Sequence, residues 1–265
     1  MLSNSLNYIK NKLNGVVPDT AIILGSGLGG LIKALKNPIA IPYAEIPDFP
    51  QTTVVGHSGC FYVGQIGTHN VLCMQGRFHL YEGIAPQLIA HIISLLKKLG
   101  CKQLILTNAS GSLKTNLPEG SLLLIKDHIN MSGQNPLIGP HDEPYFPDMG
   151  NAYPKELRQK FLEVAKKENI NVTEGVYMML LGPNYETPSE VKLFQNFGAD
   201  VVGMSTVPET ICAVHQGLKV LGVSVVSNLC TGLSEHKPNH EDVLKVVGNA
   251  TEKLAYLIQK YLEKE

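Results

Sequence analysis

Five polar side chains come directly after apolar segments that have the composition of buried strands. They are Ser26, Ser110, Glu186, Ser205 and Asn228. In α/β proteins, ligands bind where the carboxyl ends of strands meet, so these five positions could face one crevice. One polar loop residue is ordinary, but the repetition of the pattern predicts a ligand site.

A glycine-rich turn carries the first of these residues. Gly25-Ser26-Gly27 follows the apolar run Ala21–Leu24 and precedes a helix expected over Leu28–Leu35. Glycines let the backbone approach an anion closely, and the free N–H groups at a helix start point toward it. We therefore expect this loop to hold phosphate as a reactant.

The same glycines also fit a dinucleotide-binding fingerprint. Gly25, Gly27 and Gly30 match G-x-G-x-x-G, and Glu45 lies near the spacing of a ribose-binding acid. Against this interpretation, Glu45 lies in the proline-bounded segment Pro42–Pro47 and not at the end of a clean second strand. From the loop alone, a phosphate site and a nicotinamide-dependent oxidoreductase are equally supported.

A second cluster combines a cation with two polar rings. Arg77, His79 and Tyr81 alternate after an apolar run, and period two places them on one face. The arginine fork suits a phosphate dianion because it donates two parallel hydrogen bonds. His57 lies between glycines in another loop. Together with the glycine turn, these residues favour an anion site.

Two histidines near the C-terminus raise the question of a metal. His236 and His240 are four residues apart, but Pro238 lies between them, so they are not expected to share a helix face. No H-E-x-x-H pattern occurs, and we predict no metal. His240 follows Asn239, the expected cap of the last helix, which would aim it at the strand ends.

The rest of the chain alternates between strand and helix patterns, which predicts an α/β fold with a largely buried sheet and one domain over residues 1–265. Strands are expected over Ala21–Leu24, Cys60–Ile66, Asn70–Met74, Gln103–Thr107, Ser121–Ile125, Val172–Leu181, Asp200–Gly203 and Lys219–Ser227. Helices are expected over Ser3–Leu13, Pro86–Leu99 and Pro154–Glu168, and after capping boxes at Thr187–Glu190 and Thr206–Glu209. Loops or extended segments are expected over Pro38–Pro50, Asn108–Ser112, Met131–Asn151 and Asn228–Pro238.

Composition narrows the class of partner. The net charge of −1 gives no general attraction to nucleic acid or to an acidic membrane. No apolar stretch is long enough to span a bilayer, and the first residues, with Asn and Lys through their middle, do not form a signal peptide. We expect a cytoplasmic protein. The five cysteines have no CxxC spacing and are expected to be buried free thiols.

Ten segments in order resemble the trimeric purine nucleoside phosphorylases that act on inosine and guanosine. The segments are LGSGLGGL, GHSG, QGRFHLYEG, LTNASGS, DHIN, SGQNPLIGPHDE, GPNYETPSE, GADVVGMSTVPE, SNLCTG and NHEDVL, which run from about residue 22 to 245. The resemblance implies a mixed, partly barrel-like central sheet flanked by helices, a homotrimer, no cofactor, and orthophosphate as co-substrate.

The resemblance also implies a role for each site residue. The implied phosphate site consists of Ser26, His57, Arg77, His79, the backbone at Ala109, and Ser205. The implied ribose and purine sites consist of Tyr81, Met204, His240, Tyr185, Glu186, Asn228 and Val243. The residues implied to be catalytic are Glu186, Asn228, His79 and His240.

Glu186 bears on specificity. Hypoxanthine and guanine present an N1–H donor, whereas adenine presents a bare acceptor that a carboxylate cannot bind. A site built on such a hydrogen bond can discriminate by roughly 10⁴ or more, so we expect 6-oxopurine nucleosides as substrates. The methylthioadenosine phosphorylases share the fold but typically have aspartate in place of Asn228, and that activity is the alternative within the family. A nucleoside-binding protein without turnover is a third possibility.

The chain departs from the family pattern at several positions. The segment after His141-Asp142-Glu143 is short, and Tyr145 is the candidate for an aromatic that reaches a neighbouring subunit's ribose site. Tyr185 replaces a frequent phenylalanine, and Cys230 lies near the expected base pocket. These changes are expected to tune affinity for the base.

Overall fold

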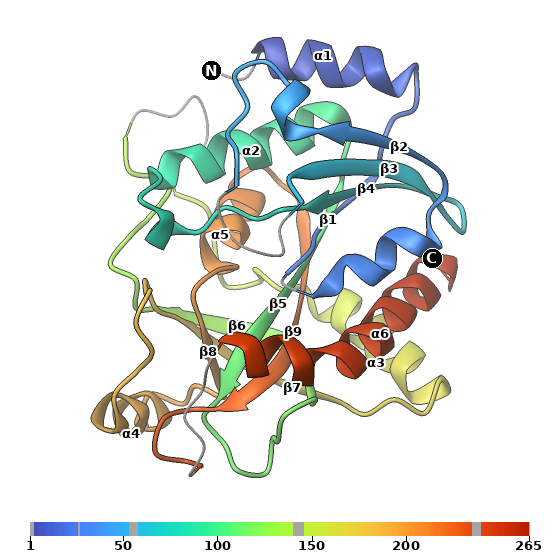
Figure 1. Cartoon of the computed structure of the whole chain (residues 1–265). Coiled ribbons are helices and arrows are strands. Elements are labelled where there is room, and N and C mark those ends of the chain that lie inside the picture. The colour runs from blue at the N-terminus through green and yellow to red at the C-terminus, as the bar shows by residue number, and fades with distance from the viewer. Residues whose placement is uncertain (1–2, 26, 53–57, 140–145, 235–239, 265) are drawn as a thin grey trace.

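The computed structural model describes residues 3–25, 27–52, 58–139, 146–234 and 240–264, with the side chains of 240–247 left out. Its strands form one mixed sheet in the order β2-β3-β4-β1-β5-β8-β7-β6-β9. A further pairing of β9 with β5 closes the last five strands into a barrel (Figure 1). The strands are β1 (Thr20–Ile23), β2 (Lys36–Pro42), β3 (Cys60–Ile66), β4 (His69–Gln75), β5 (Gln103–Ser112), β6 (Leu122–Asn130), β7 (Val172–Met179), β8 (Val201–Gly203) and β9 (Lys219–Leu229).

Helices cover both faces of this sheet. The α-helices are α1 (Ser3–Leu13), α2 (Pro86–Leu99), α3 (Lys155–Lys167), α4 (Pro188–Asn196), α5 (Val207–His215) and α6 (His240–Lys264). Three short 3₁₀ helices, η1 (Leu28–Ala34), η2 (Tyr43–Glu45) and η3 (Leu80–Glu82), complete the described elements. In Figure 1, α2 and α5 lie on one side of the central strands, and α3 and α6 lie on the other.

The apolar strand runs are continuous because both faces of the sheet are buried. In β1, Ala21 and Ile23 pack with residues of α1, α2 and α5. Ile22 lies in a separate core with η1, α3 and α6. Successive side chains of a strand point to opposite faces, so burial on both sides removes the polar alternation expected of a half-exposed strand. The predicted α/β class with a partly barrel-like mixed sheet is confirmed.

Several local predictions are confirmed. The ranges of α1 and α2 match their predictions, and β3 and β4 form the predicted hairpin. Thr187 caps α4 as predicted: its side chain accepts from the Glu190 N–H, and the Glu190 carboxylate accepts from the Thr187 N–H. All five cysteines are free and buried. Among the described residues, no helix is long and apolar enough to cross a membrane.

Other predictions are wrong in an informative way. The small residues Asn108–Ser112 continue strand β5, because β9 and β8 pair with their backbone. Asn228 likewise lies inside β9, so it and Ser110 precede the strand ends rather than follow them. The segment Pro38–Pro50 begins in the edge strand β2, which agrees with the expected extended edge. The helix expected after the glycine turn is present, but as the 3₁₀ helix η1.

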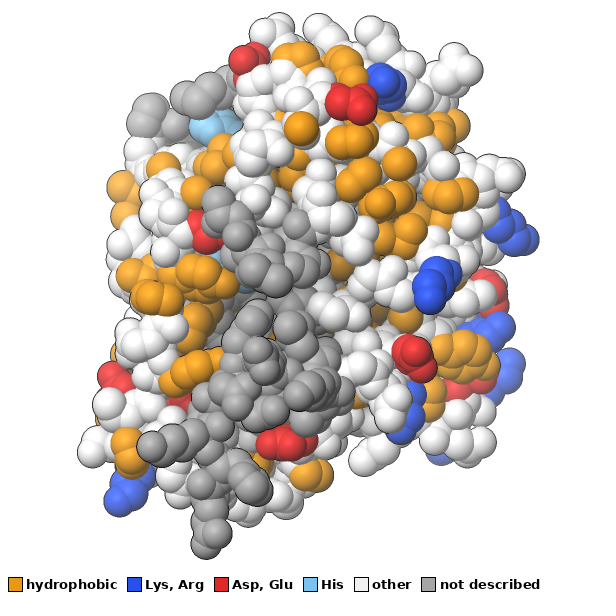
Figure 2. Space-filling view, in the orientation of Figure 1, with side chains coloured by type: hydrophobic (Ala, Val, Ile, Leu, Met, Phe, Trp, Pro, Cys, Tyr) orange, Lys and Arg blue, Asp and Glu red, His pale blue; other side chains and the backbone are white. Residues whose placement is uncertain are grey.

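Charges of both signs share the surface. On the face shown in Figure 2, the described acidic and basic side chains are interspersed, most densely over α3 and α6. This mixture agrees with the net charge of −1. Among the described side chains of this face, no basic patch of the kind that binds a nucleic-acid backbone is present.

Gly25 sits where β1 approaches the backbone of β5. Its N–H donates to Thr107 Oγ1 at 3.0 Å, and a Cβ at Gly25 would lie 2.7 Å from the Thr107 carbonyl oxygen. We expect Gly25→Ala to lower the free energy of unfolding by about 1–3 kcal/mol, because the strands must separate to accept the methyl group. Urea unfolding measures this loss.

Gly30 provides the matched control within the same motif. A Cβ at Gly30 would meet nothing within 4 Å. Gly30→Ala should therefore leave stability unchanged or raise it by about 0.4–1 kcal/mol. Equal losses for the two variants would contradict the close approach at Gly25.

Candidate active site

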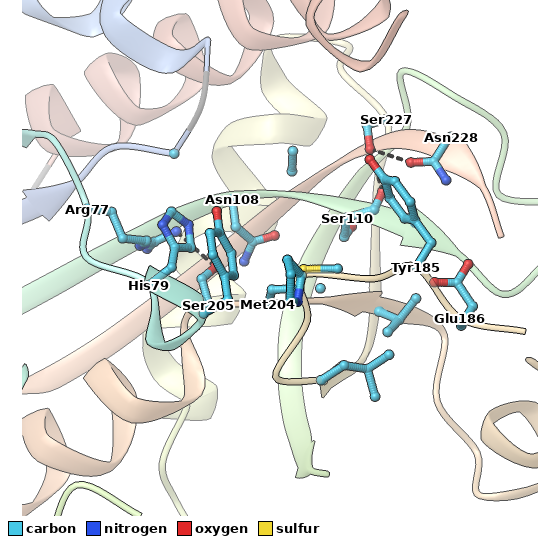
Figure 3. A pocket seen from close by; sticks show the side chains of 18 residues that line it. Arg77, His79, Asn108, Ser110, Tyr185, Glu186, Met204, Ser205, Ser227 and Asn228 are labelled. Carbon is cyan, nitrogen blue, oxygen red and sulfur yellow. Dashed lines mark hydrogen bonds between the residues drawn. The ribbon is translucent and has the colours of Figure 1, made fainter. Parts of the chain in front are cut away.

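Side chains from the ends of six strands surround one cavity of about 450 Å³ (Figure 3). The strands β1, β4, β7 and β8 lead into loops that supply part of its lining, and β5 and β9 supply the rest from their final residues. The lining residues include Gly25, Arg77, His79, Tyr81, Asn108, Ala109, Ser110, Tyr185, Glu186, Met204, Ser205, Ser227 and Asn228. Figure 3 shows Arg77, His79 and Ser205 at one end, Glu186 and Asn228 at the other, and Met204 between them.

Arg77 makes the first end a site for an anion. Its side chain is only 2% exposed, and its Nη1 donates to the Thr107 carbonyl at 2.9 Å and to Ser205 Oγ at 3.1 Å. Its Nε lies 2.8 Å from Glu209 Oε1. Among the described lining residues, Arg77 is the one Lys or Arg side chain. A planar guanidinium in this position suits phosphate or another oxyanion.

His79 and Tyr81 lie next to this arginine. Strand β4 ends at Gln75 and Tyr81 lies in η3, so period two does not describe the two residues. Both rings nevertheless line the cavity, and they stack with their centroids 4.7 Å apart. Glu82 accepts from the His79 backbone N–H at 2.7 Å and lies 3.2 Å from His79 Nδ1. Burial and the charge of Glu82 raise the pKa of Tyr81 to about 12, so its hydroxyl is neutral at physiological pH.

Two buried oxygen atoms in the cavity lining point to a ligand. Asn108 Nδ2 donates to Thr206 Oγ1 at 2.8 Å, but Asn108 Oδ1 has no hydrogen-bond partner among the described residues. The same is true of Ser110 Oγ. Buried polar atoms are normally paired, so both atoms are consistent with a polar ligand in the cavity.

The other end of the cavity combines a carboxylate with an amide. Glu186 is 5% exposed, and its Oε1 accepts from the Thr231 backbone N–H at 3.1 Å. Asn228 Oδ1 accepts from Ser227 Oγ at 2.8 Å, and its Nδ2 donates to the Leu229 carbonyl at 3.1 Å. An amide NH₂ has two hydrogens, so a second one can go to a ligand. This end can therefore both accept and donate hydrogen bonds.

The structure brings together most of the residues predicted from the sequence. Arg77, His79, Tyr81, Ala109, Tyr185, Glu186, Met204, Ser205 and Asn228 all line the one cavity. Ser26, His57 and Tyr145 lie outside the described residues. Helix α6 begins at His240, but the side chains of His240 and Val243 are not among those described.

Three polar side chains at this site, those of Asn108, Ser227 and Glu209, were not predicted. Asn108 and Ser227 line the cavity from inside β5 and β9, and Glu209 contacts Arg77 from behind it. Glu209 was expected to close a capping box with Thr206, but Thr206 makes no side-chain cap, and its φ of 76° is positive. The sequence offered one signal for Asn108 and Ser227, their position in the chain. Asn108 directly precedes Ala109, and Ser227 directly precedes Asn228, both of which were predicted site residues.

The dinucleotide interpretation fails on the position of Glu45. Its carboxylate accepts from Tyr8 Oη at 3.1 Å and from Lys12 Nζ at 3.3 Å on the exposed side of α1. Glu45 does not line the cavity that Gly25 lines. Among the described residues, no group of three or more His, Cys, Asp or Glu side chains is placed to hold a metal ion.

Cys230 lies against the carboxylate of Glu186. Burial and this negative charge raise the pKa of the Cys230 thiol, and burial alone raises that of Cys73 to about 12. A thiol with a raised pKa stays protonated, so at pH 8 a pKa of 12 leaves roughly 10⁻⁴ as thiolate. We expect the native protein to show no fast reaction with a disulfide reagent at pH 8, and five equivalents of thiol after denaturation. A fast native reaction that survives Cys60→Ser, which removes the thiol whose pKa burial raises least, would contradict this expectation.

Comparison with known proteins places this cavity among related ones. The model of the phosphorylase superfamily matches residues 19–263. The chain is 44% identical over 232 residues to purine nucleoside phosphorylase 1 of Bacillus subtilis, covering 86% of each chain. Crystal structures of Schistosoma mansoni purine nucleoside phosphorylase with adenosine and with inosine are 41% identical to it, with TM-scores of 0.94 and 0.93. Those matches cover 99% and 100% of this chain and 96% of each of theirs.

Proposed function

The chain belongs to the phosphorylase superfamily, and we propose that it cleaves 6-oxopurine ribonucleosides and deoxyribonucleosides with orthophosphate in a reversible reaction. The products are the free base and the sugar 1-phosphate, so the protein is a pentosyltransferase. The observation that carries the proposal is the opposition of Arg77 to Glu186 and Asn228 across one cavity. A Schistosoma mansoni relative has been crystallised with inosine, which is such a substrate.

We assign the arginine end to phosphate. Arg77 Nη1 and Ser205 Oγ are 3.1 Å apart. Ala109 lines the same cavity, and its backbone joins the phosphate site by the family resemblance. Glu82 lies beside His79 Nδ1 and favours the tautomer with the proton on that nitrogen. His79 Nε2 can then accept a hydrogen bond from the P–OH group of a phosphate monoanion. Ser26 and His57 join this site by the family resemblance.

The sugar is assigned to the middle of the cavity. Met204 lies between the two ends. Tyr81 lines the same cavity with a neutral hydroxyl that can donate to a ribose oxygen. By resemblance, His240 orients the 5′-hydroxyl, and Tyr145 reaches the ribose of a neighbouring subunit. With phosphate on one side and base on the other, the anomeric carbon lies between its nucleophile and its leaving group, which provides the orientation term of catalysis.

The purine is assigned to the other end. In this assignment Glu186 accepts from N1–H, Asn228 donates to N7 or O6, and Tyr185 contacts the ring. Val243 joins the purine site by the family resemblance. As the C1′–N9 bond breaks, negative charge accumulates on the base and positive charge on the sugar. Asn228 stabilises the first and the phosphate anion stabilises the second, without any cofactor or metal.

Substrate turnover tests the proposal directly. Hypoxanthine should be released from inosine only when phosphate is present, and kcat/KM for adenosine should be lower by roughly 10⁴ because Glu186 cannot pair with the bare N1. Glu186→Ala should lower kcat/KM for inosine by about 10²–10³ and remove most of this discrimination. A coupled assay of free base measures all three.

The control lies four residues along the chain. Glu190→Ala removes a carboxylate that caps α4 and does not line the cavity, so it should leave the inosine-to-adenosine ratio unchanged. Phosphate-independent cleavage, or tight NADH binding with no phosphorolysis, would refute the proposal. Binding of inosine without turnover would indicate a nucleoside-binding protein, and efficient cleavage of methylthioadenosine would indicate the alternative activity within the family.

We further propose that the protein is a cytoplasmic homotrimer that serves purine salvage. The proposal is supported by the resemblance to the trimeric phosphorylases and, for Tyr145, by a role that needs a neighbouring subunit. Sedimentation equilibrium should give three times the chain mass of 28.8 kDa. A stable monomer with full activity would refute the trimer.

A further inference from the structure

We infer that Glu209 is the positioning residue that holds Arg77 in the orientation that phosphate requires. The inference rests on the proposed function, because it takes phosphate as the ligand of Arg77. Glu209 belongs to neither the predicted site nor the lining of the cavity. It acts from behind the arginine.

Contacts on two of its three nitrogens fix the guanidinium plane. Glu209 Oε1 lies 2.8 Å from Nε, and Nη1 donates to the Thr107 carbonyl and to Ser205 Oγ. Ser205 is itself assigned to phosphate, so its hydroxyl can leave Arg77 and bind the ligand instead. Glu209 and the Thr107 carbonyl are the partners that can stay in place when phosphate binds.

Solvent has little access to this carboxylate in the unaltered protein. The side chains of Arg77 and Glu209 are 2% and 5% exposed. A small void of about 10 Å³ behind them is otherwise lined by apolar side chains. These are Ile23, Met74, Phe78, Ile89, Ile92 and Ile93. A void of this size holds at most about one water molecule, and these walls offer it no polar partners.

The local backbone geometry explains why Glu209 contacts Arg77 and does not cap its own helix. In the capping box at α4, the third helical residue returns its carboxylate to the N-cap N–H. At α5, the N-cap Thr206 has a positive φ, and a γ-turn hydrogen bond joins Val207 N–H to the Ser205 carbonyl at 2.8 Å. The same sequence pattern therefore gives a cap at α4 and a partner for arginine at α5.

Glu209→Ala tests the inference. It should raise the KM for phosphate by about 10-fold or more, because it removes the opposite charge beside a buried guanidinium. The KM for inosine should stay within about twofold, because Glu186 and Asn228 are untouched. Glu209→Gln retains an oxygen near Nε and should recover most of the loss. A merely structural defect would change both KM values together.

The second arginine supplies a matched control. Arg77 and Arg158 are the two arginines of the chain, and Arg158 pairs with Glu174 away from the cavity. Glu174→Ala should leave the KM for phosphate unchanged. A KM for phosphate that is unchanged or lowered in Glu209→Ala would overturn the inference, and so would a Glu209→Gln variant as defective as Glu209→Ala. If the unaltered protein lacked phosphate-dependent cleavage, the proposed function would fail instead.

A measurement on the unaltered protein covers the case in which Glu209→Ala does not fold. Labelling with ¹⁵N-arginine gives two Nε–H resonances, and Arg158→Lys assigns them. The Arg77 Nε–H should exchange slowly with solvent both without and with saturating phosphate. Rapid exchange in the phosphate-bound protein would overturn the inference.

Discussion

A buried guanidinium is the constraint on which this site depends. Removing an ion from water costs several kcal/mol unless hydrogen bonds and an opposite charge compensate it. Arg77 meets that requirement with partners from three places in the fold: Thr107 in β5, Ser205 after β8, and Glu209 in α5. The cation can be buried only where these elements meet. The cationic site therefore forms only when the sheet and α5 are correctly assembled.

Closure of the barrel brings these partners together. Strand β5 is parallel to β1 at its start and to β9 along its length, and it pairs with β8 only at its last two residues. The pairing of β5 with β9 shifts register between Ser110 and Gly111, where Ser227 of β9 is the extra residue, and then continues to Ser112. Bulges often lie beside active sites because they redirect side chains. Here the irregularity coincides with the part of β5 that lines the cavity.

Local features of the fold could be predicted, and features set by distant contacts could not. Pro86 and Gly100 mark the ends of α2, and Thr187 caps α4, because those signals act within a few residues. Asn108–Ser112 has the composition of a loop but is held as strand by β9, whose pairing residues are more than 100 positions away. The family resemblance and the positions of polar residues near strand ends predicted that Arg77, His79, Glu186 and Asn228 would share one cavity. The contact of Arg77 with Glu209 could not be predicted, because a capping-box pattern does not show which partner its carboxylate will bind.

The charges at the two ends of the cavity also favour the proposed direction of substrate binding. Among the described lining residues, Arg77 carries the one formal positive charge of a Lys or Arg side chain and Glu186 the one carboxylate. A phosphate dianion placed beside Glu186 would meet repulsion of about 4 kcal/mol per pair of unit charges at 4 Å in a partly buried site, whereas beside Arg77 the same term is attractive. An oxopurine turned end for end would leave its N1–H facing a cation. Opposed charges at the two ends of the cavity therefore favour the proposed arrangement of phosphate, sugar and base, in which the nucleophile lies opposite the leaving group.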